Sequence, residues 1–348
     1  MYPIRQFLGN VRQIARSAAP LMWRVRGQER VTGEPLVLLY SGVHTQREYF
    51  LDTVFDGAIE IEPVGRGWIG SIDRTARRFG CDLSIQTVRK ELRFTAVNSE
   101  AFYTPLWIDA TVDLQTFDSR RKPGELKGDL RRIRKHGLTF SATRQHDQIT
   151  EFYDTVYLAY IRERYGGRAL IPGRESIKER AKAGDLELIS IYYEGSAVGG
   201  SVIDHSFNPP RLSILGAATT DPGILKTGVM SASYIFAIRH LIDQGAPLFN
   251  LGMNRSFIRD GVLQYKRKLG AKLNMPSDMG AIIRLISRSD GVRSFLSANP
   301  FISSQNNQLW LLTFLTPQGS LLCDEKYWLY HNQLFDGLAG VKKIKLRG

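Results

Sequence analysis

Cysteine is scarce in this chain of 348 residues, which contains only Cys81 and Cys323. The two lie far apart, and neither belongs to a CxxC pair or to a Cys/His cluster with zinc-ligand spacing. The sequence therefore predicts neither a disulfide framework nor a metal site. So few thiols are typical of a reducing compartment, and we expect a cytoplasmic protein.

Long hydrophobic runs are missing as well. No stretch of about 18 apolar residues occurs, so no membrane-spanning helix is predicted. Residues 1–28 contain no acidic side chain, and their apolar residues from Ile4 to Ala18 recur at helical spacing among arginines. This pattern predicts a basic amphipathic helix over residues 1–30. The helix either packs on its own domain or makes a peripheral contact, through residues 1–28, with an anionic membrane.

The charge balance is strongly basic. Lys and Arg number 47 against 34 Asp and Glu, which gives a net charge of +13. Such a charge favours an anionic partner, whether nucleic acid, a phosphorylated donor or an anionic membrane surface. A basic surface without a partner is the alternative.

The length is sufficient for two domains. A polar, basic stretch at residues 118–135 carries Pro123-Gly124 near its centre, and we place a domain boundary there. The predicted parts are the helix 1–30, a first domain 31–120, a second domain 121–280 and an extension 281–348. Within the extension, residues 281–296 have a helical pattern.

A literal GxGxxG occurs at Gly65–Gly70, between an expected strand and a basic helix over residues 71–79. A dinucleotide fingerprint has this form, but it needs an acidic residue about twenty positions further on, in a βαβ context. The surroundings here do not supply that context. We therefore interpret the motif as a glycine-rich turn before a surface helix.

The most ordered pattern lies between Arg211 and Lys272. It predicts a strand at 212–217, a turn-rich loop at 219–228, a helix at 229–244 and a strand at 248–252. A loop that leads into a helix N-terminus is suited to anions, because the first-turn N–H groups are unpaired and the helix dipole is positive there. An ordinary crossover without a ligand is the alternative.

Five segments in order resemble the GNAT acyltransferase superfamily, and within it the Fem-type branch. They are the basic entry DLRRIRKHGL at 129–138, the hairpin EGSAVGG at 194–200, LGA at 215–217, NLG at 250–252 and DGVLQYKRKLG at 260–270. The resemblance implies an α/β (α+β) fold with a GNAT-like mixed central sheet flanked by helices. It also implies two tandem GNAT-like domains, the first a divergent copy.

The resemblance further implies an enzyme in which an amine attacks a thioester or ester carbonyl directly. No GxSxG motif or local Cys signature predicts a covalent intermediate. His205 and Asp260 are candidate bases, and Lys266 corresponds to a lysine near the transferred group in Fem-type enzymes. The alternatives are a partly buried strand-end histidine for His205 and a surface lysine for Lys266.

The remaining candidate residues fall into two sets. The donor is expected to contact Leu215, Gly216, Ala217, Lys226, Thr227, Gly228 and Val229. The acceptor or phosphate groups are expected to contact Asn254, Arg255, Tyr265, Arg131 and Arg134. The glycine loop departs from the superfamily pattern R/Q-x-x-G-x-G/A, because Met230 occupies its last position.

Three functions follow. The first is an N-acyltransferase with an acyl-CoA-like donor and an amine acceptor. The second is an aminoacyl transferase that uses aminoacyl-tRNA, which the net charge favours. The third is a non-catalytic binding protein that keeps the fold.

Overall fold

The structure is a computed structural model, and it describes residues 19–95, 100–117, 126–166, 171–274, 278–322 and 335–346. Most of the predicted N-terminal helix (residues 1–18) lies outside these ranges. So do residues 118–125 of the basic stretch and Cys323. No helix within the described ranges is long and apolar enough to cross a membrane.

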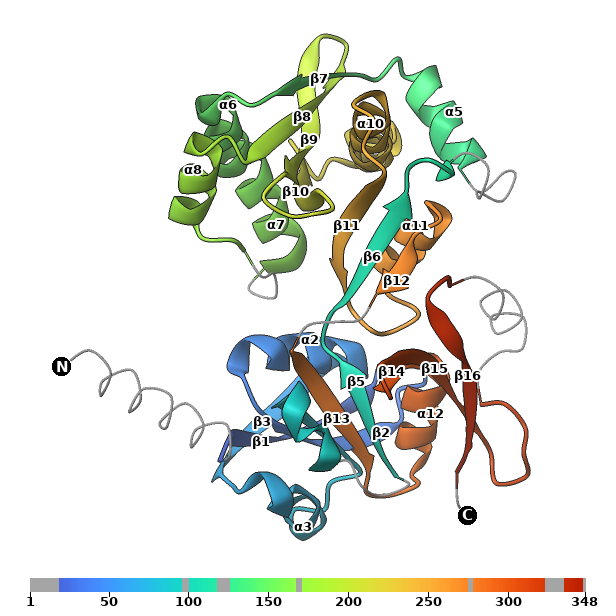
Figure 1. Cartoon of the computed structure of the whole chain (residues 1–348). Helices are drawn as coiled ribbons and strands as arrows, with labels where there is room; N and C mark the ends of the chain where they lie inside the picture. The colour runs from blue at the N-terminus through green and yellow to red at the C-terminus, as the bar shows by residue number, and fades with distance from the viewer. Residues whose placement is uncertain are drawn as a thin grey trace, which may run out of the picture. The chain divides into compact units, whose positions relative to one another are not determined.

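The chain forms two compact units and passes between them repeatedly (Figure 1). Unit 1 contains Met1–Ile108, Asn254–Leu263 and Asn274–Gly348, and unit 2 contains Asp109–Met253 and Gln264–Leu273. The boundary predicted near residue 120 therefore lies at residue 108. Residues 281–348, predicted to be an extension, belong to unit 1.

A seven-stranded mixed sheet forms the centre of unit 2. Its order is β12 (Lys272–Asn274), β6 (Ile108–Asp113), β11 (Leu248–Asn254), β10 (Arg211–Ala217), β9 (Ser196–Asp204), β8 (Leu186–Tyr193) and β7 (Thr139–Thr143). The predicted hairpin is present, because β8 and β9 pair antiparallel around Glu194-Gly195. Gly195 has a positive φ of 78°, which glycine adopts without a steric penalty.

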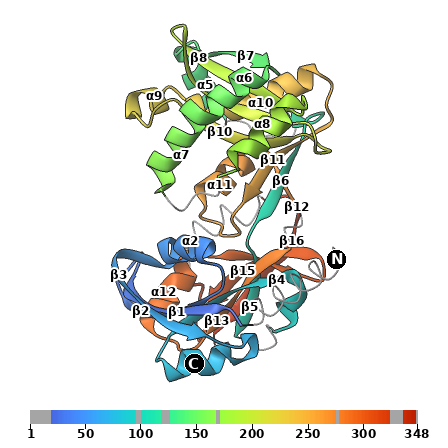
Figure 2. The ribbon, with the colours of Figure 1, turned by 90° about the vertical axis from the view of Figure 1, so that its left-hand side faces the viewer.

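Helices cover both faces of this sheet (Figure 2). One face packs against α6 (His146–Glu151), η3 (Phe152–Tyr157), α7 (Leu158–Tyr165) and α8 (Arg174–Lys182). The other face packs against α10 (Val229–Asp243), where Phe236 stacks on Phe140 with ring centroids 4.9 Å apart. Gly199 allows this approach, because a Cβ there would lie 2.8 Å from Val229 Cγ2.

Unit 1 is built on a six-stranded mixed sheet. Its order is β3 (Phe55–Arg66), β1 (Leu21–Glu29), β2 (Pro35–Ser41), β4 (Leu83–Arg89), β13 (Met279–Leu285) and β5 (Ala101–Pro105). A smaller sheet contains β14 (Phe301–Gln305), β15 (Gln308–Leu315) and β16 (Leu338–Lys345). The mixed sheets and their flanking helices confirm the predicted fold class.

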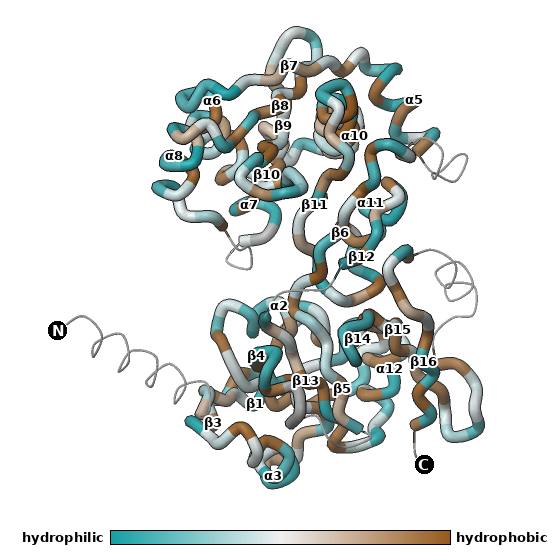
Figure 3. Tube along the Cα trace, viewed as in Figure 1, coloured by the Kyte–Doolittle hydropathy of each residue, from teal (hydrophilic) through white to brown (hydrophobic). Residues whose placement is uncertain are grey.

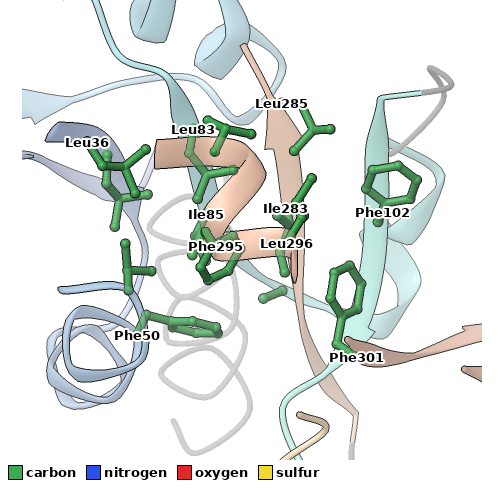
Figure 4. Close-up of a cluster of buried hydrophobic side chains, with 14 of the residues drawn as sticks. Leu36, Phe50, Leu83, Ile85, Phe102, Ile283, Leu285, Phe295, Leu296 and Phe301 are labelled. Atoms are coloured by element: carbon green, nitrogen blue, oxygen red, sulfur yellow. The ribbon is translucent and has the colours of Figure 1, made fainter. Parts of the chain in front are cut away.

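The main hydrophobic core of unit 1 lies on one face of the larger sheet (Figure 4). It joins strand residues such as Leu83 and Ile283 to α2 (His44–Val54) and α12 (Asp290–Ala298). The other face is covered by α3 (Ile72–Arg78), whose Ile72 and Ala76 are buried.

Two predicted helices are strands in part. Residues 21–29, placed in the N-terminal helix, form β1, which pairs with both β2 and β3. Residues 281–296 divide into β13 and α12. Strand β13 is buried on both faces, so its apolar residues run continuously and do not show the alternation of a half-exposed strand.

The central position of β13 can be tested through Ile283, which is fully buried between β4 and β5. We expect Ile283→Ala to lower the free energy of unfolding by about 2–5 kcal/mol, because it leaves a cavity in the core. Ile61→Ala, on the exposed edge strand β3, serves as the control and should cost much less. Chemical denaturation followed by circular dichroism measures both, and equal small losses would contradict this placement.

Candidate functional site

Strands β10 and β11 separate soon after they meet. They run parallel, and their recorded pairing consists of Arg211 with Asn250. Strand β10 also shifts register against β9 between Leu212 and Ile214. The carboxyl-terminal half of β10 therefore pairs with β9 on one edge, while its other edge has no backbone pairing with β11 beyond Arg211; this unpaired stretch is called the opening here.

The amide directions on this edge follow from the pairing with β9. Ala218 N donates to Val198 O at 2.8 Å, and Ala217 is opposite Gly199. Successive N–H groups of a strand point to opposite edges, so the amides of Leu215 and Ala217 point away from β9. Gly216, between them, points its amide towards β9. Two neighbouring donors are thus directed at the opening.

Lys266, on α11 (Gly261–Lys268), holds the end of β11 in place. Its side chain is 3% exposed, and Nζ donates to the carbonyl oxygens of Gly252 at 3.0 Å and Met253 at 3.2 Å. Gly252 has a φ of +82°, and a Cβ there would lie 2.9 Å from Leu212 O. Lys266, predicted near the transferred group with a surface lysine as the alternative, is therefore a buried cation that fixes the kinked strand end.

The predicted phosphate turn lies directly before α10, and α5 (Lys127–Lys135) covers it. Thr227, Gly228 and Val229 are buried, whereas Lys226 is exposed. A Cβ at Gly228 would lie 3.3 Å from Arg132 Cβ, on α5. The first turn of α10 is thus packed against another helix.

A carboxylate already lies at this helix terminus. Asp129, 5% exposed, accepts a hydrogen bond from Ser231 Oγ at 3.1 Å and forms an ion pair with Arg132. Ser231 is in the first turn of α10, where negative charge is stabilised by the helix dipole. Nearby, the Tyr265 ring packs on Tyr234 at 5.2 Å between centroids, and burial raises the pKa of Tyr265.

The outer surface of α5 is cationic. Its exposed side chains are Lys127, Arg131, Arg132, Arg134 and Lys135, and Figure 3 shows the hydrophilic colour of this helix. Only Asp129 and Ile133 of α5 are buried. The helix therefore seals the turn before α10 with one face and presents positive charge with the other.

His205 belongs to a separate cluster around Glu187. Its Nε2 lies 2.8 Å from Glu187 Oε2, and His240 Nε2 lies 3.1 Å from Glu187 Oε1. Arg144 approaches the same carboxylate at 3.4 Å. Burial raises the pKa of Glu187, but the hydrogen bonds from His205 and His240 outweigh this effect and lower the pKa to about 2.

The cluster is remote from the turn before α10. His205 follows β9, whose Asp204 pairs with Arg211 at the start of β10, whereas the turn follows Ala217 at the end of β10. A strand rises about 3.3 Å per residue, so the two sites are about 20 Å apart along β10.

Asn254, Arg255 and Asp260 belong to unit 1. The Arg255 guanidinium lies 3.7 Å from the ring centroids of both Tyr49 and Trp107, and it donates to Gln46 Oε1 at 2.8 Å. Burial lowers the pKa of Arg255 to about 10. This cation is held mainly by aromatic faces, an arrangement that favours the planar guanidinium over an ammonium group.

Asn254 and Asp260, two other predicted site residues in unit 1, form hydrogen bonds with backbone atoms. Asn254 Nδ2 donates to Ile108 O at 3.2 Å, and Asp260 Oδ1 accepts from Leu263 N at 2.9 Å at the start of α11.

No protein-family model matches this chain, and no curated protein matches it. Solved structures that it resembles include L-PGS from Bacillus licheniformis, with 14% identity, 79% of this chain and 88% of that one covered, and a TM-score of 0.34. FemX matches with 11% identity, coverage of 72% and 82%, and a TM-score of 0.39. A GCN5-related N-acetyltransferase from Sphaerobacter thermophilus matches with 12% identity, coverage of 74% and 79%, and a TM-score of 0.34.

The structure contains the strand–loop–helix connection that the sequence spacing predicted. Within unit 2, the opening at Leu215–Ala217 and the turn at 226–229 are the two ends of one strand–loop–helix connection. Neither the Asp129–Ser231 hydrogen bond nor the Glu187–His205 pair was predicted from the sequence. The only signal for Asp129 in the sequence was its position at the start of the motif DLRRIRKHGL, next to the basic residues of that motif.

The Glu187 cluster makes a prediction about acid stability. A carboxylate whose pKa falls from 4.5 to about 2 on folding stabilises the protein above pH 4.5, and this contribution is lost as the pH falls through 2. We expect Glu187→Gln to have a lower free energy of unfolding than the unmodified protein at neutral pH. This difference in free energy, called the gap here, should narrow by up to about 3 kcal/mol towards pH 2. Denaturant titrations at several pH values measure the gap, and exposed Glu179→Gln serves as the control. A gap independent of pH would contradict the role of this carboxylate.

Proposed function

We propose that this chain transfers an aminoacyl group from aminoacyl-tRNA to an amine acceptor. The observation that carries the proposal is the α5–α10 contact, which buries the first turn of α10 under Asp129 and Arg132. The motifs that resemble Fem-type and other GNAT acyltransferases support the general reaction. The buried turn favours the nucleic-acid donor over the CoA donor.

A CoA diphosphate at this turn needs exposed backbone N–H groups. Here Thr227, Gly228 and Val229 are buried, and a carboxylate already accepts from the Ser231 hydroxyl. A diphosphate at the same place would meet the Asp129 charge. The exposed cations of α5 instead suit a long polyanion, because Lys and Arg side chains bind phosphates without a shaped pocket.

The opening between β10 and β11 supports the chemical step. In the proposed reaction the acceptor nitrogen attacks the ester carbonyl carbon, the new C–N bond forms and the C–O bond to the ribose breaks. The proton lost by the amine is transferred, through a base, to the departing ribose oxygen. We assign the developing oxyanion to one of the amides of Leu215 and Ala217, because amides two residues apart on a strand lie about 6.6 Å from each other, too far for both to bind one oxygen atom.

The remaining residues have narrower roles in this proposal. Lys266 positions the end of β11 and does not itself contact the oxyanion. His205 is a structural residue in this proposal, because its Nε2 atom is already engaged by Glu187.

The donor assignment predicts that charge reversal on α5 weakens tRNA binding. We expect Lys127→Glu/Arg131→Glu to raise the Kd for tRNA by about tenfold or more at low salt, and to reduce the salt dependence, because phosphate contacts are lost. Filter binding at several salt concentrations measures both quantities. Lys182→Glu/Arg239→Glu reverses the same number of exposed charges on other helices and should bind as the unmodified chain does.

An acyl-CoA donor would give the opposite pattern. CoA would then raise the melting temperature of the protein, and tRNA would neither bind nor change it. That result would overturn the donor assignment and return acyl-CoA as the donor.

The oxyanion assignment predicts the effect of removing one amide. Proline lacks the N–H group and is tolerated where that group points away from a paired strand. We expect Ala217→Pro or Leu215→Pro to lower kcat for aminoacyl transfer by about 10²–10³ with tRNA affinity retained. Ala217→Gly keeps the amide and is the control. Full activity in both proline variants, with intact melting transitions, would refute the assignment.

A further inference from the structure

Arg255 is a buried cation of unit 1 without a carboxylate partner. Only 7% of the residue is exposed, and no acidic side chain in the described ranges forms an ion pair with it. Burial lowers the pKa of Arg255 to about 10, and the charge of Asp260 counters this effect only from beyond ion-pair distance. A buried charge without a counter-ion is destabilising, because water no longer solvates it fully.

Arg284 shows how the same unit completes such a site. It is 4% exposed, donates to Gln86 Oε1 at 2.8 Å and pairs with Asp73, with Nε and Oδ1 3.1 Å apart. Arg255 likewise donates to a glutamine oxygen, that of Gln46, at 2.8 Å. In the described part of the chain, however, Arg255 has no counterpart of Asp73.

Two nitrogens of the Arg255 guanidinium are available to a ligand. Gln46 binds Nη1, and within the described ranges neither Nε nor Nη2 forms a hydrogen bond. Neither atom is sealed from solvent, in contrast to Nε of Arg24, which is buried without a partner. The N–H groups of Nε and Nη2 point in the same direction along one edge of the planar group. This edge is therefore open to solvent.

The same edge of an arginine binds a carboxylate elsewhere in the chain. Arg174 Nε donates to Asp154 Oδ1 at 2.7 Å, and its Nη2 donates to Oδ2. Two parallel N–H groups match the two oxygens of a carboxylate. The Arg255 guanidinium lies between the rings of Tyr49 and Trp107, 3.7 Å from each centroid, so its plane is fixed before a ligand binds.

The charges around the guanidinium favour an anion with a single negative charge. Burial raises the pKa of Tyr49, Arg255 lowers it, and the acids Asp260 and Asp52 raise it. One cation therefore faces two acids at longer range. A phosphate monoester carries a charge of about −1.5 to −2 at neutral pH and would be repelled more strongly by these acids than a carboxylate.

We propose that Arg255, held by Tyr49, Trp107 and Gln46, binds the carboxylate group of a small molecule. The two carboxylate oxygens accept hydrogen bonds from Nε and Nη2, and they supply the counter-charge that no described side chain supplies. The site lies within unit 1 and does not depend on the transfer reaction proposed above.

The first test uses the full chain and acetate as the probe. Its five tryptophans give five indole N–H signals in a ¹H–¹⁵N NMR spectrum, and Trp107→Phe identifies the signal of Trp107. We expect acetate to shift this signal saturably, with a Kd on the order of millimolar for one charge-assisted pair. Chloride at the same ionic strength should not shift it. No response to acetate, or an equal response to chloride, would overturn the proposal.

Two arginine variants test the planar edge. Arg255→Lys keeps the charge but removes the two parallel N–H groups, so we expect it to weaken acetate binding at least tenfold. Arg259→Lys, at an exposed arginine of the same segment, is the matched control and should bind acetate as the unmodified chain does. Unchanged binding in Arg255→Lys would refute the assignment of the site.

Inorganic phosphate tests the class of anion. It should bind at least tenfold more weakly than acetate at the same pH and ionic strength, because of its higher charge beside Asp260 and Asp52. Tighter binding of phosphate than of acetate would overturn the assignment to a carboxylate.

A glutamine variant tests the missing counter-charge without relying on Arg255→Lys. Gln46→Glu places a carboxylate of the same shape against Nη1. We expect the melting temperature to rise by about 2 °C or more, and acetate binding to weaken at least threefold. A lower melting temperature with unchanged acetate binding would contradict the proposal.

The matched control is Gln86→Glu beside Arg284. That arginine is already paired with Asp73, and Gln86 Nε2 also donates to Ile69 O at 3.4 Å. A glutamate there adds a surplus buried charge and loses this hydrogen bond, so the melting temperature should fall. A rise in both variants would show a general effect of added acid and refute the special position of Arg255.

Discussion

The carboxylate of Asp129 lies against the first turn of α10, and the proposed donor site depends on this contact. A helix N-terminus attracts an anion because its N–H groups are unpaired and its dipole is positive. Here a side chain from the same unit supplies that anion, and α5 excludes solvent from Gly228. The exposed face of α5 is then the more suitable place for donor phosphates.

The interleaving of the chain imposes a second constraint. The larger sheet of unit 1 is complete only when β13 lies between β4 and β5. In the sequence, β13 comes after most of unit 2. Its buried residues pair with strands from the first third of the sequence. Many contacts of unit 1 therefore join residues that are far apart in the sequence. Such contacts slow folding relative to a unit made of local contacts.

Several charged side chains of unit 2 serve structure at places where their chemistry would also suit catalysis. Lys266 stabilises a strand end that contains a left-handed glycine, and Asp204 is bound by Arg180 and by Ser206. Such buried charges are costly unless they are paired. A sequence motif marks Lys266, but only its partners distinguish a positioning role from contact with substrate.

The sequence by itself determined the elements whose pattern is local: the hairpin at 194–200, the helix after Gly228 and the strand before Gly252. Turn chemistry and apolar periodicity act over a few residues, so these could be predicted. The tertiary structure alone decided that residues 281–285 are a central strand, because a continuously buried strand and a buried helix share one apolar pattern. It alone placed Asp129 against Ser231 and Glu187 between two histidines, because pairing across distant segments leaves no periodic signal.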